Sequence, residues 1–121
     1  MRIGELSSRT GVSVRSLRYY EEQGLLHPQR TDSGQRVYTD DAIERVRFFQ
    51  SMFAAGLSSQ RIYELLPCMT SGTTDHGQRQ MLRTERERIA QEVVALETAL
   101  KRLDDVIRVA DDRAATTSAS T

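Results

Sequence analysis

A seven-residue repeat of apolar side chains marks the C-terminal part of this chain. Between residues 78 and 110, two interleaved columns recur at seven-residue spacing, namely Leu82, Ile89, Leu96, Leu103 and Ala110, and Arg86, Val93, Leu100 and Ile107. Such a repeat predicts one helix of about 50 Å whose apolar stripe is the seam of a coiled coil. The residues before it are too few to cover the stripe, so we expect a second copy of the chain to do so.

The segment 14–25 predicts a short helix with two unlike faces. Val14, Leu17 and Tyr20 share an apolar side, whereas the other side carries Arg15, Arg18, Tyr19 and Glu22 at helical spacing. A rigid face of arginine and tyrosine is suited to the major groove of DNA, because arginine binds guanine or phosphate with two N–H groups. We therefore predict DNA contacts by Arg15, Arg18 and Tyr19 and a core position for Tyr20. The alternative is a solvated face with an Arg18–Glu22 ion pair.

The flanking residues complete a winged helix-turn-helix pattern. Residues 3–10 predict a helix, 11–13 a tight turn with Ser13 as the next N-cap, and Gly24 a left-handed C-cap. Residues 25–38 predict a hairpin, or wing, around Asp32-Ser33-Gly34. Its expected DNA contacts are Arg30, Arg36 and, at the base, Tyr38. The alternative for these residues is a strand edge that keeps arginine outward for solubility.

Two more helices are predicted between the wing and the coiled coil. Residues 39–41 open the first with a cap and acidic side chains, and Gly56 closes it. The second begins at Leu57-Ser58, buries Ile62, Leu65 and Leu66, and ends at Pro67. Ser58 and Ser13 are the cap residues expected near DNA phosphates, although simple capping is the alternative for Ser58. The predicted organisation is a DNA-binding domain over 1–67, a linker over 68–77, a coiled coil over 78–110 and a disordered tail over 111–121.

Composition limits the classes of protein that fit. The formal net charge is zero, and 16 of the 17 basic residues are arginine. Binding to nucleic acid would therefore depend on individually positioned arginine side chains and not on overall charge. A codon bias explains the excess of arginine over lysine equally well. Cys68 is the only cysteine, so no internal disulfide forms. Without an apolar leader or a membrane-length apolar run, a cytoplasmic location is expected.

The order of these elements resembles the MerR family of transcription factors, named after the mercury-resistance regulator. The matching residues are Ile3-Gly4-Glu5-Leu6, Thr10-Gly11-Val12-Ser13, Leu17-Arg18-Tyr19-Tyr20-Glu21, Gly24-Leu25-Leu26, Pro28-Gln29-Arg30, Gly34-Gln35-Arg36-Val37-Tyr38 and Gly56-Leu57-Ser58. Gln35 is a departure, because the family usually has an aromatic residue there.

The resemblance implies a homodimer joined by an antiparallel coiled coil. Leu82, Ile89, Val93, Leu96, Leu100, Leu103 and Ile107 would form its seam. The dimer would bind a two-fold symmetric DNA operator between two promoter elements separated by an over-long spacer. Bending and untwisting that DNA would then let RNA polymerase engage both elements.

The nature of any effector stays open in the sequence. Cys68 is a candidate redox sensor, or else a small buried apolar residue. No metal site or cofactor is expected, because Cys68, Met69 and His76 are scattered over a linker. Phe48, Met52, Tyr63 and Met69 are candidate linings for a small-molecule pocket, or ordinary core residues.

Three other classes of function compete with a DNA-binding regulator. An enzyme is not expected, because no nucleophile–base set or phosphate loop is present. A module that only dimerises would expose an apolar stripe instead of Arg15, Arg18 and Tyr19. A dimeric architectural protein that bends DNA, like an excisionase, shares the wing, but such proteins generally lack a long coiled coil.

Overall fold

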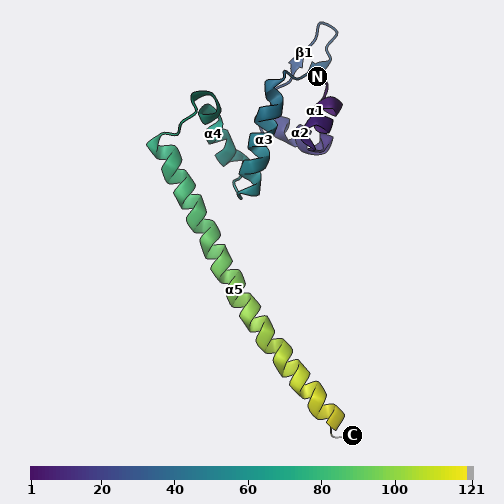
Figure 1. The fold of residues 1–121 in the computed structure, drawn as a ribbon, viewed down its shortest axis with the longest axis vertical. Helices are drawn as coiled ribbons and strands as arrows, with labels where there is room; N and C mark the ends of the chain where they lie inside the picture. The colour runs from purple at the N-terminus through teal and green to yellow at the C-terminus, as the bar shows by residue number, and fades with distance from the viewer. Residues whose placement is uncertain (120–121) are drawn as a thin grey trace. The chain divides into compact units, whose positions relative to one another are not determined.

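The chain is mainly helical, with one small hairpin (Figure 1). The computed structural model describes residues 1–119 and divides into two compact units, Met1–Gln80 and the residues from Met81 onward. The elements in order are α1 (Ile3–Thr10), α2 (Val14–Glu22), β1 (Gln29–Arg30), β2 (Arg36–Val37), α3 (Asp41–Ala54), α4 (Ser59–Ser71) and α5 (His76–Ala119).

The core of the first unit lies where α1, α2, α3 and α4 meet. Its largest fully buried side chains are Phe49, Leu6, Leu17, Leu25, Ile62 and Val46. Tyr20 of α2 is 7% exposed and packs on α3, with its ring 5.7 Å from Phe49 and 5.5 Å from Phe53 between centroids. Aromatic pairs of this kind contribute about 0.5–1.5 kcal/mol beyond the area they bury. The predicted core position of Tyr20 is confirmed, and α2 is fixed to α3.

The turn between α1 and α2 is set by a glycine and a serine. Gly11 adopts a left-handed φ of 75°, which its missing Cβ allows. Ser13 caps α2, because its hydroxyl oxygen accepts a hydrogen bond from the Ser16 N–H at 3.1 Å. Val12 between them is buried and holds the turn on the core. The predicted helix-turn-helix is confirmed.

The end of α2 is a Schellman motif that starts the wing. Gly24 has a φ of 74°, its N–H bonds the Glu21 carbonyl at 3.0 Å, and the Leu25 N–H bonds the Tyr20 carbonyl at 2.9 Å. This reversal turns Leu25 and Leu26 into the core. The predicted C-cap role of Gly24 is confirmed.

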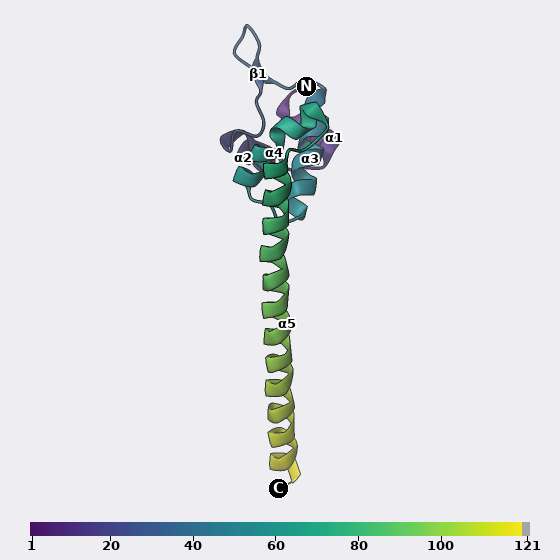
Figure 2. The ribbon, with the colours of Figure 1, turned by 90° about the vertical axis from the view of Figure 1, so that its left-hand side faces the viewer.

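The wing is a two-stranded antiparallel hairpin. Gln29 pairs with Val37 and Arg30 with Arg36, so the two arginines lie opposite each other beside the loop. Inside the loop, the Gly34 N–H bonds the Thr31 carbonyl at 2.8 Å. Figure 2 shows this loop standing clear of the helices of its own unit. The predicted hairpin is confirmed.

Helix α3 begins without the predicted side-chain cap. Asp40 has helical backbone angles and makes no capping hydrogen bond. The Thr39 hydroxyl bonds the Asp41 carboxylate instead, and the carbonyl of Thr39 accepts from the Ala42 N–H. Asp41 and Glu44 still place negative charge in the first turn, as expected. The apolar stripe of α3 buries Ala42, Val46 and Phe49.

Helix α4 continues through Pro67, and the prediction that Pro67 ends it is wrong. The helix runs to Ser71, where Gly72 with a φ of 72° donates its N–H to the Cys68 carbonyl at 2.8 Å. The physical reason is that the apolar spacing of Ile62, Leu65 and Leu66 extends to Met69, so one face still gains from packing beyond Pro67. The predicted linker of residues 68–77 is therefore shorter in the structure, where residues 72–75 connect α4 to α5.

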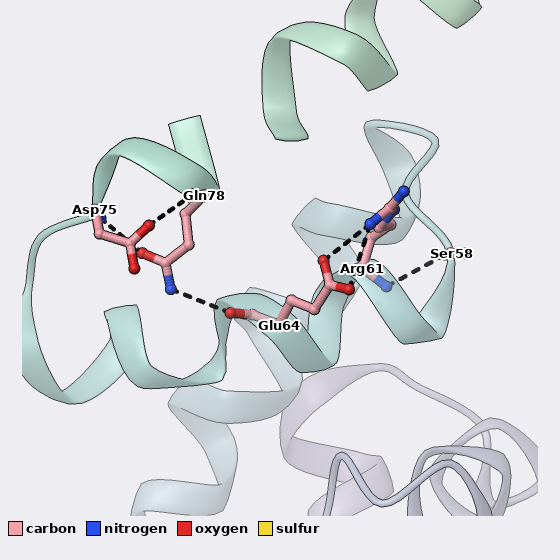
Figure 3. Close-up of polar contacts among 5 residues, drawn as sticks. All are labelled: Ser58, Arg61, Glu64, Asp75 and Gln78. Atoms are coloured by element: carbon pink, nitrogen blue, oxygen red, sulfur yellow. Dashed lines mark hydrogen bonds and ion pairs between the residues drawn. The ribbon is translucent and has the colours of Figure 1, made fainter. Parts of the chain in front are cut away.

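Helix α5 begins with a capping box that the sequence reading missed. The Asp75 carboxylate accepts from the Gln78 N–H at 2.7 Å, and the Gln78 side-chain oxygen accepts from the Asp75 N–H at 2.8 Å. The Gln78 amide also donates to the Glu64 carbonyl of α4 at 3.1 Å, as Figure 3 shows. These bonds place the start of α5 at His76, two residues before the predicted position.

The predicted disorder of residues 111–121 is also wrong over the part that the structure describes. Helix α5 continues to Ala119, and the Thr116 hydroxyl bonds the Asp112 carbonyl at 2.9 Å. Extending an existing helix requires no new nucleus, and Ala114 and Ala115 have high helix propensity. Residues 120 and 121 lie outside the described residues.

Candidate nucleic-acid interface

The outer face of α2 carries the side chains that are predicted to contact DNA. Arg15, Arg18 and Tyr19 are exposed, and with Glu22 they surround a shallow hollow. Leu17 and Tyr20 on the opposite side are buried, so the helix is held with its arginine face outward. The predicted division of α2 into two faces is confirmed.

Tyr19 combines a fixed ring with an exposed surface. Its side chain is 44% exposed, while its ring centroid lies 6.4 Å from that of Phe53 and 6.5 Å from that of Tyr20. A ring supported in this way loses little conformational entropy when it meets a second surface. Tyr19 can therefore offer a hydroxyl and a ring edge to a sugar–phosphate backbone.

A groove of about 370 Å³ separates α2 from the wing. It is lined by Arg18, Glu21, Glu22, Leu26, His27, Pro28, Arg30 and Arg36. The structure thus brings Arg18 to the same groove as the two wing arginines. Arg15 and Tyr19 lie at the neighbouring hollow, which shares Arg18 and Glu22 with the groove.

The two wing arginines are held by different partners. Arg30 donates from Nη1 to the Gly34 carbonyl at 3.1 Å, which closes the loop of the wing on itself. Arg36 donates from Nη1 to Oε2 of Glu21 at 3.0 Å, which connects β2 to the last turn of α2. Both arginines remain exposed to solvent.

Tyr38 is buried beneath this surface, which leaves its side chain little area for the predicted contact with DNA. Its side chain is only 3% exposed, because the chain turns inward after β2 to reach α3. Ser13 and Ser58 are exposed, and each hydroxyl oxygen accepts a backbone N–H, from Ser16 and Arg61 respectively. Helix capping alone therefore explains why serine occurs at these two positions, without any contact to DNA.

Sequence reasoning missed Glu21 and the bond between Arg2 and Gln35. Arg2 donates from Nη2 to the Gln35 side-chain oxygen at 2.5 Å, so Gln35 links the loop of the wing to the residue before α1. Glu21 and Arg36 are 15 positions apart, and Arg2 and Gln35 are 33 apart. Pairs so far apart leave no local pattern in a sequence. The only signal for the second pair is Gln35, which stands where the family usually has an aromatic residue.

Most of the expected effector residues line a separate groove between α3 and α4. Cys68 is half-buried and lines an open groove of about 700 Å³ with Phe48, Met52 and Met69, together with Glu44, Arg47 and Ser51. Tyr63 is not in that lining and is 55% exposed on α4. Within residues 1–119, no group of three or more metal-binding side chains lies close enough together to hold an ion. No described helix is both long enough and apolar enough to span a bilayer.

The turn-linked helices, the hairpin and the exposed arginine face together define a winged helix-turn-helix protein with a long C-terminal helix. The profile of the "MerR HTH family regulatory protein" matches residues 1–68, and the chain belongs to this family. Similar proteins include the mercuric resistance operon regulatory protein of Bacillus cereus and several solved transcription regulators.

Relatives and solved structures resemble most of the chain. It is 36% identical over 113 residues to the nodulation protein NolA of Bradyrhizobium sp. (strain NC92), covering 93% of this chain and 45% of the relative. The lead(II) complex of the transcription regulator PbrR691 from Ralstonia metallidurans CH34 has a TM-score of 0.76 at 25% identity, covering 89% and 86% of the two chains.

A third similar protein was solved on DNA. HiNmlR, a MerR family regulator lacking the sensor domain and bound to promoter DNA, has a TM-score of 0.57 at 21% identity, covering 84% and 78%, and shares the fold. The chain spans about half the length of most of the curated relatives it matches, including NolA and the mercuric resistance regulator of Bacillus cereus.

Proposed function

We propose that this chain binds a two-fold symmetric promoter operator as a homodimer and regulates transcription by bending the DNA. The observation that carries the proposal is the rigid outer face of α2, where Arg15, Arg18 and Tyr19 stand exposed beside the wing arginines. Membership of the MerR family and the DNA-bound relative of the same fold support it.

The role of each side chain follows from its chemistry. Arg18 lies between the hollow and the groove, so it is placed to read a base edge or bind a phosphate. Arg15 and Tyr19 would contact the flanking backbone, and Arg30 and Arg36 would meet the backbone beside the wing. In this proposal RNA polymerase responds to the altered DNA, without a contact to this chain.

The dimer would form through α5. Its predicted seam carries Leu96, Leu100 and Leu103, which are 70%, 61% and 56% exposed in the single chain. An exposed apolar stripe of this length favours pairing with the same stripe of a second copy. Pairing would also set the distance between two DNA-binding units, as a two-fold operator requires.

The test is the substitution Arg18→Ala. We expect it to weaken binding to DNA taken from upstream of the chain's own gene by about 1–3 kcal/mol, because one charge-assisted contact is lost. Gel-shift titration measures the affinity, and sedimentation verifies that the dimer is intact.

The matched control is Arg47→Ala, which removes the same side chain from an exposed position on α3 where it pairs with Glu44. It should leave DNA affinity within about twofold of the wild-type value, apart from a small general charge effect. Equal affinity of Arg18→Ala and the wild-type chain would contradict the assignment of the α2 face.

Control of DNA binding by an effector remains a prediction. Cys68→Ser, footprinted with and without an oxidant or an aldehyde, tests whether the thiol controls DNA binding. A response that persists in Cys68→Ser would assign it to another part of the chain, such as a small-molecule site.

A further inference from the structure

An ion pair joins the wing to α2 across the candidate interface. Oε2 of Glu21 lies 3.0 Å from Nη1 of Arg36, and the two side chains are 12% and 51% exposed. Other pairs, such as Arg9–Glu5 and Arg88–Glu92, join neighbouring turns of one helix and have both side chains about half exposed. Exposed pairs of that kind contribute little, whereas the Glu21 carboxylate is largely removed from water.

The burial of Glu21 makes its partner important. Its second carboxylate oxygen, Oε1, is buried and has no hydrogen-bond partner among the described residues. A carboxylate withdrawn from water is strongly unfavourable unless a cation compensates it. Arg36 supplies that cation, so the pair confines the Arg36 side chain and β2 next to α2.

Confinement by Glu21 leaves most of the Arg36 guanidinium available. A guanidinium carries five N–H donors, and the Glu21 contact uses Nη1. The half-exposed remainder lines the same groove as Arg18 and Arg30. An arginine side chain that is already held in place loses less conformational entropy when it binds a phosphate.

We propose that Glu21 is a positioning residue for DNA binding, which holds the wing's Arg36 in the groove where it meets a phosphate. This inference rests on the proposed function, and it assigns an acidic residue a favourable part in binding a polyanion. Glu21 itself touches no DNA in this account.

If Glu21 positions Arg36, removing its carboxylate should weaken DNA binding, which is opposite to the effect expected from charge alone. Removing a negative charge near DNA should tighten binding, because repulsion of the phosphates falls. Removing a positioning carboxylate should weaken binding, because Arg36 and the wing lose their anchor. Glu22 lines the same groove one residue further on, is exposed, and provides the matched control.

The experiment compares six chains on a DNA duplex that the wild-type chain protects in footprinting. They are the wild type, Glu21→Gln, Glu21→Asp, Glu22→Gln, Arg36→Ala and the double variant Glu21→Gln/Arg36→Ala. Affinity is measured by fluorescence anisotropy over a series of salt concentrations, and thermal unfolding verifies that each chain is folded.

We expect Glu21→Gln to weaken binding about tenfold, while Glu22→Gln binds equally well or more tightly. Arg36→Ala should weaken binding and lower the salt slope by about one, because one phosphate contact is lost. In the Arg36→Ala background, Glu21→Gln should cause no further loss, since the group it positions is already absent. Glu21→Asp, which keeps the charge, should recover most of the affinity even if Glu21→Gln folds poorly.

Two results would overturn the role of Glu21. One is a Glu21→Gln chain that binds as tightly as Glu22→Gln. The other is a loss caused by Glu21→Gln that is equally large with and without Arg36. A wild-type chain that protects no DNA would instead contradict the proposed function, so the two failures are distinguishable.

Discussion

At the scale of single residues, burial separates the tyrosines of this chain into different roles. Tyr19 is 44% exposed on α2, whereas Tyr38 is 3% exposed and its hydroxyl has no hydrogen-bond partner among the described residues. Tyr19 directly follows Arg18 and Tyr38 lies two residues after Arg36, and the sequence pattern predicts contact with DNA for both tyrosines. The direction in which the chain leaves β2 decides the role of Tyr38, and no local pattern encodes it.

Tyr38→Phe should leave the free energy of unfolding unchanged or raise it by about 1 kcal/mol. Removing a buried hydroxyl without a partner avoids its desolvation penalty, and the ring keeps its packing. Urea unfolding at a fixed protein concentration measures this, and DNA affinity should not change.

Tyr19→Phe is the matched variant and should weaken DNA binding, because its hydroxyl is proposed to reach the backbone. If Tyr38→Phe lowers the affinity as much as Tyr19→Phe does, Tyr38 contributes to DNA binding despite its burial.

At the scale of elements, the sequence is informative wherever a local interaction sets a boundary. Helix periodicity, the Ser13 cap and the left-handed Gly24 act within a few residues, and the structure has them where the sequence predicts them. The Arg15, Arg18 and Tyr19 face was predictable for the same reason, because all three belong to one helix. The Arg36–Glu21 and Arg2–Gln35 contacts depend on how separate elements pack, so they could not be predicted.

Helix α4 is the element where two local rules conflict. Pro67 donates no hydrogen bond to the Tyr63 carbonyl and disfavours a helix, but the apolar spacing continues beyond it. The helix continues past Pro67, because the Met69 side chain packs on the same apolar face and Gly72 caps the C-terminal end of the helix. The Gln78 side chain then bonds the Glu64 carbonyl, one residue after the carbonyl that Pro67 leaves without its usual donor.

Pro67→Ala should raise the free energy of unfolding by about 1–2 kcal/mol. Alanine restores the backbone hydrogen bond, and the greater freedom of the unfolded chain offsets part of the gain. Urea unfolding at one protein concentration provides the measurement. Thr70→Ala, an exposed change on the same helix, should stay within about 0.5 kcal/mol of the wild type. A destabilised Pro67→Ala would mean that α4 requires the proline.

At the scale of the whole molecule, α5 presents an apolar stripe without a partner in the single chain. The helix has 44 residues and is therefore about 66 Å long. Its exposed apolar residues include Val93, Leu96, Leu100, Leu103 and Ile107, all members of the predicted seam. Water contact with such a stripe is unfavourable along its full length, and pairing with a second α5 would remove it.

The most direct test of the account is the mass of the chain and of its DNA complex, measured by analytical ultracentrifugation. We predict that the wild-type chain sediments as a dimer and carries two chains per operator duplex. Leu96→Glu should sediment as a monomer, because a buried charge would separate the seam. Thr98→Glu, with the same charge two residues away and off the seam, should remain a dimer. A wild-type chain that is monomeric at micromolar concentration would contradict the account. A Leu96→Glu chain that stays dimeric with unchanged DNA stoichiometry would also contradict it.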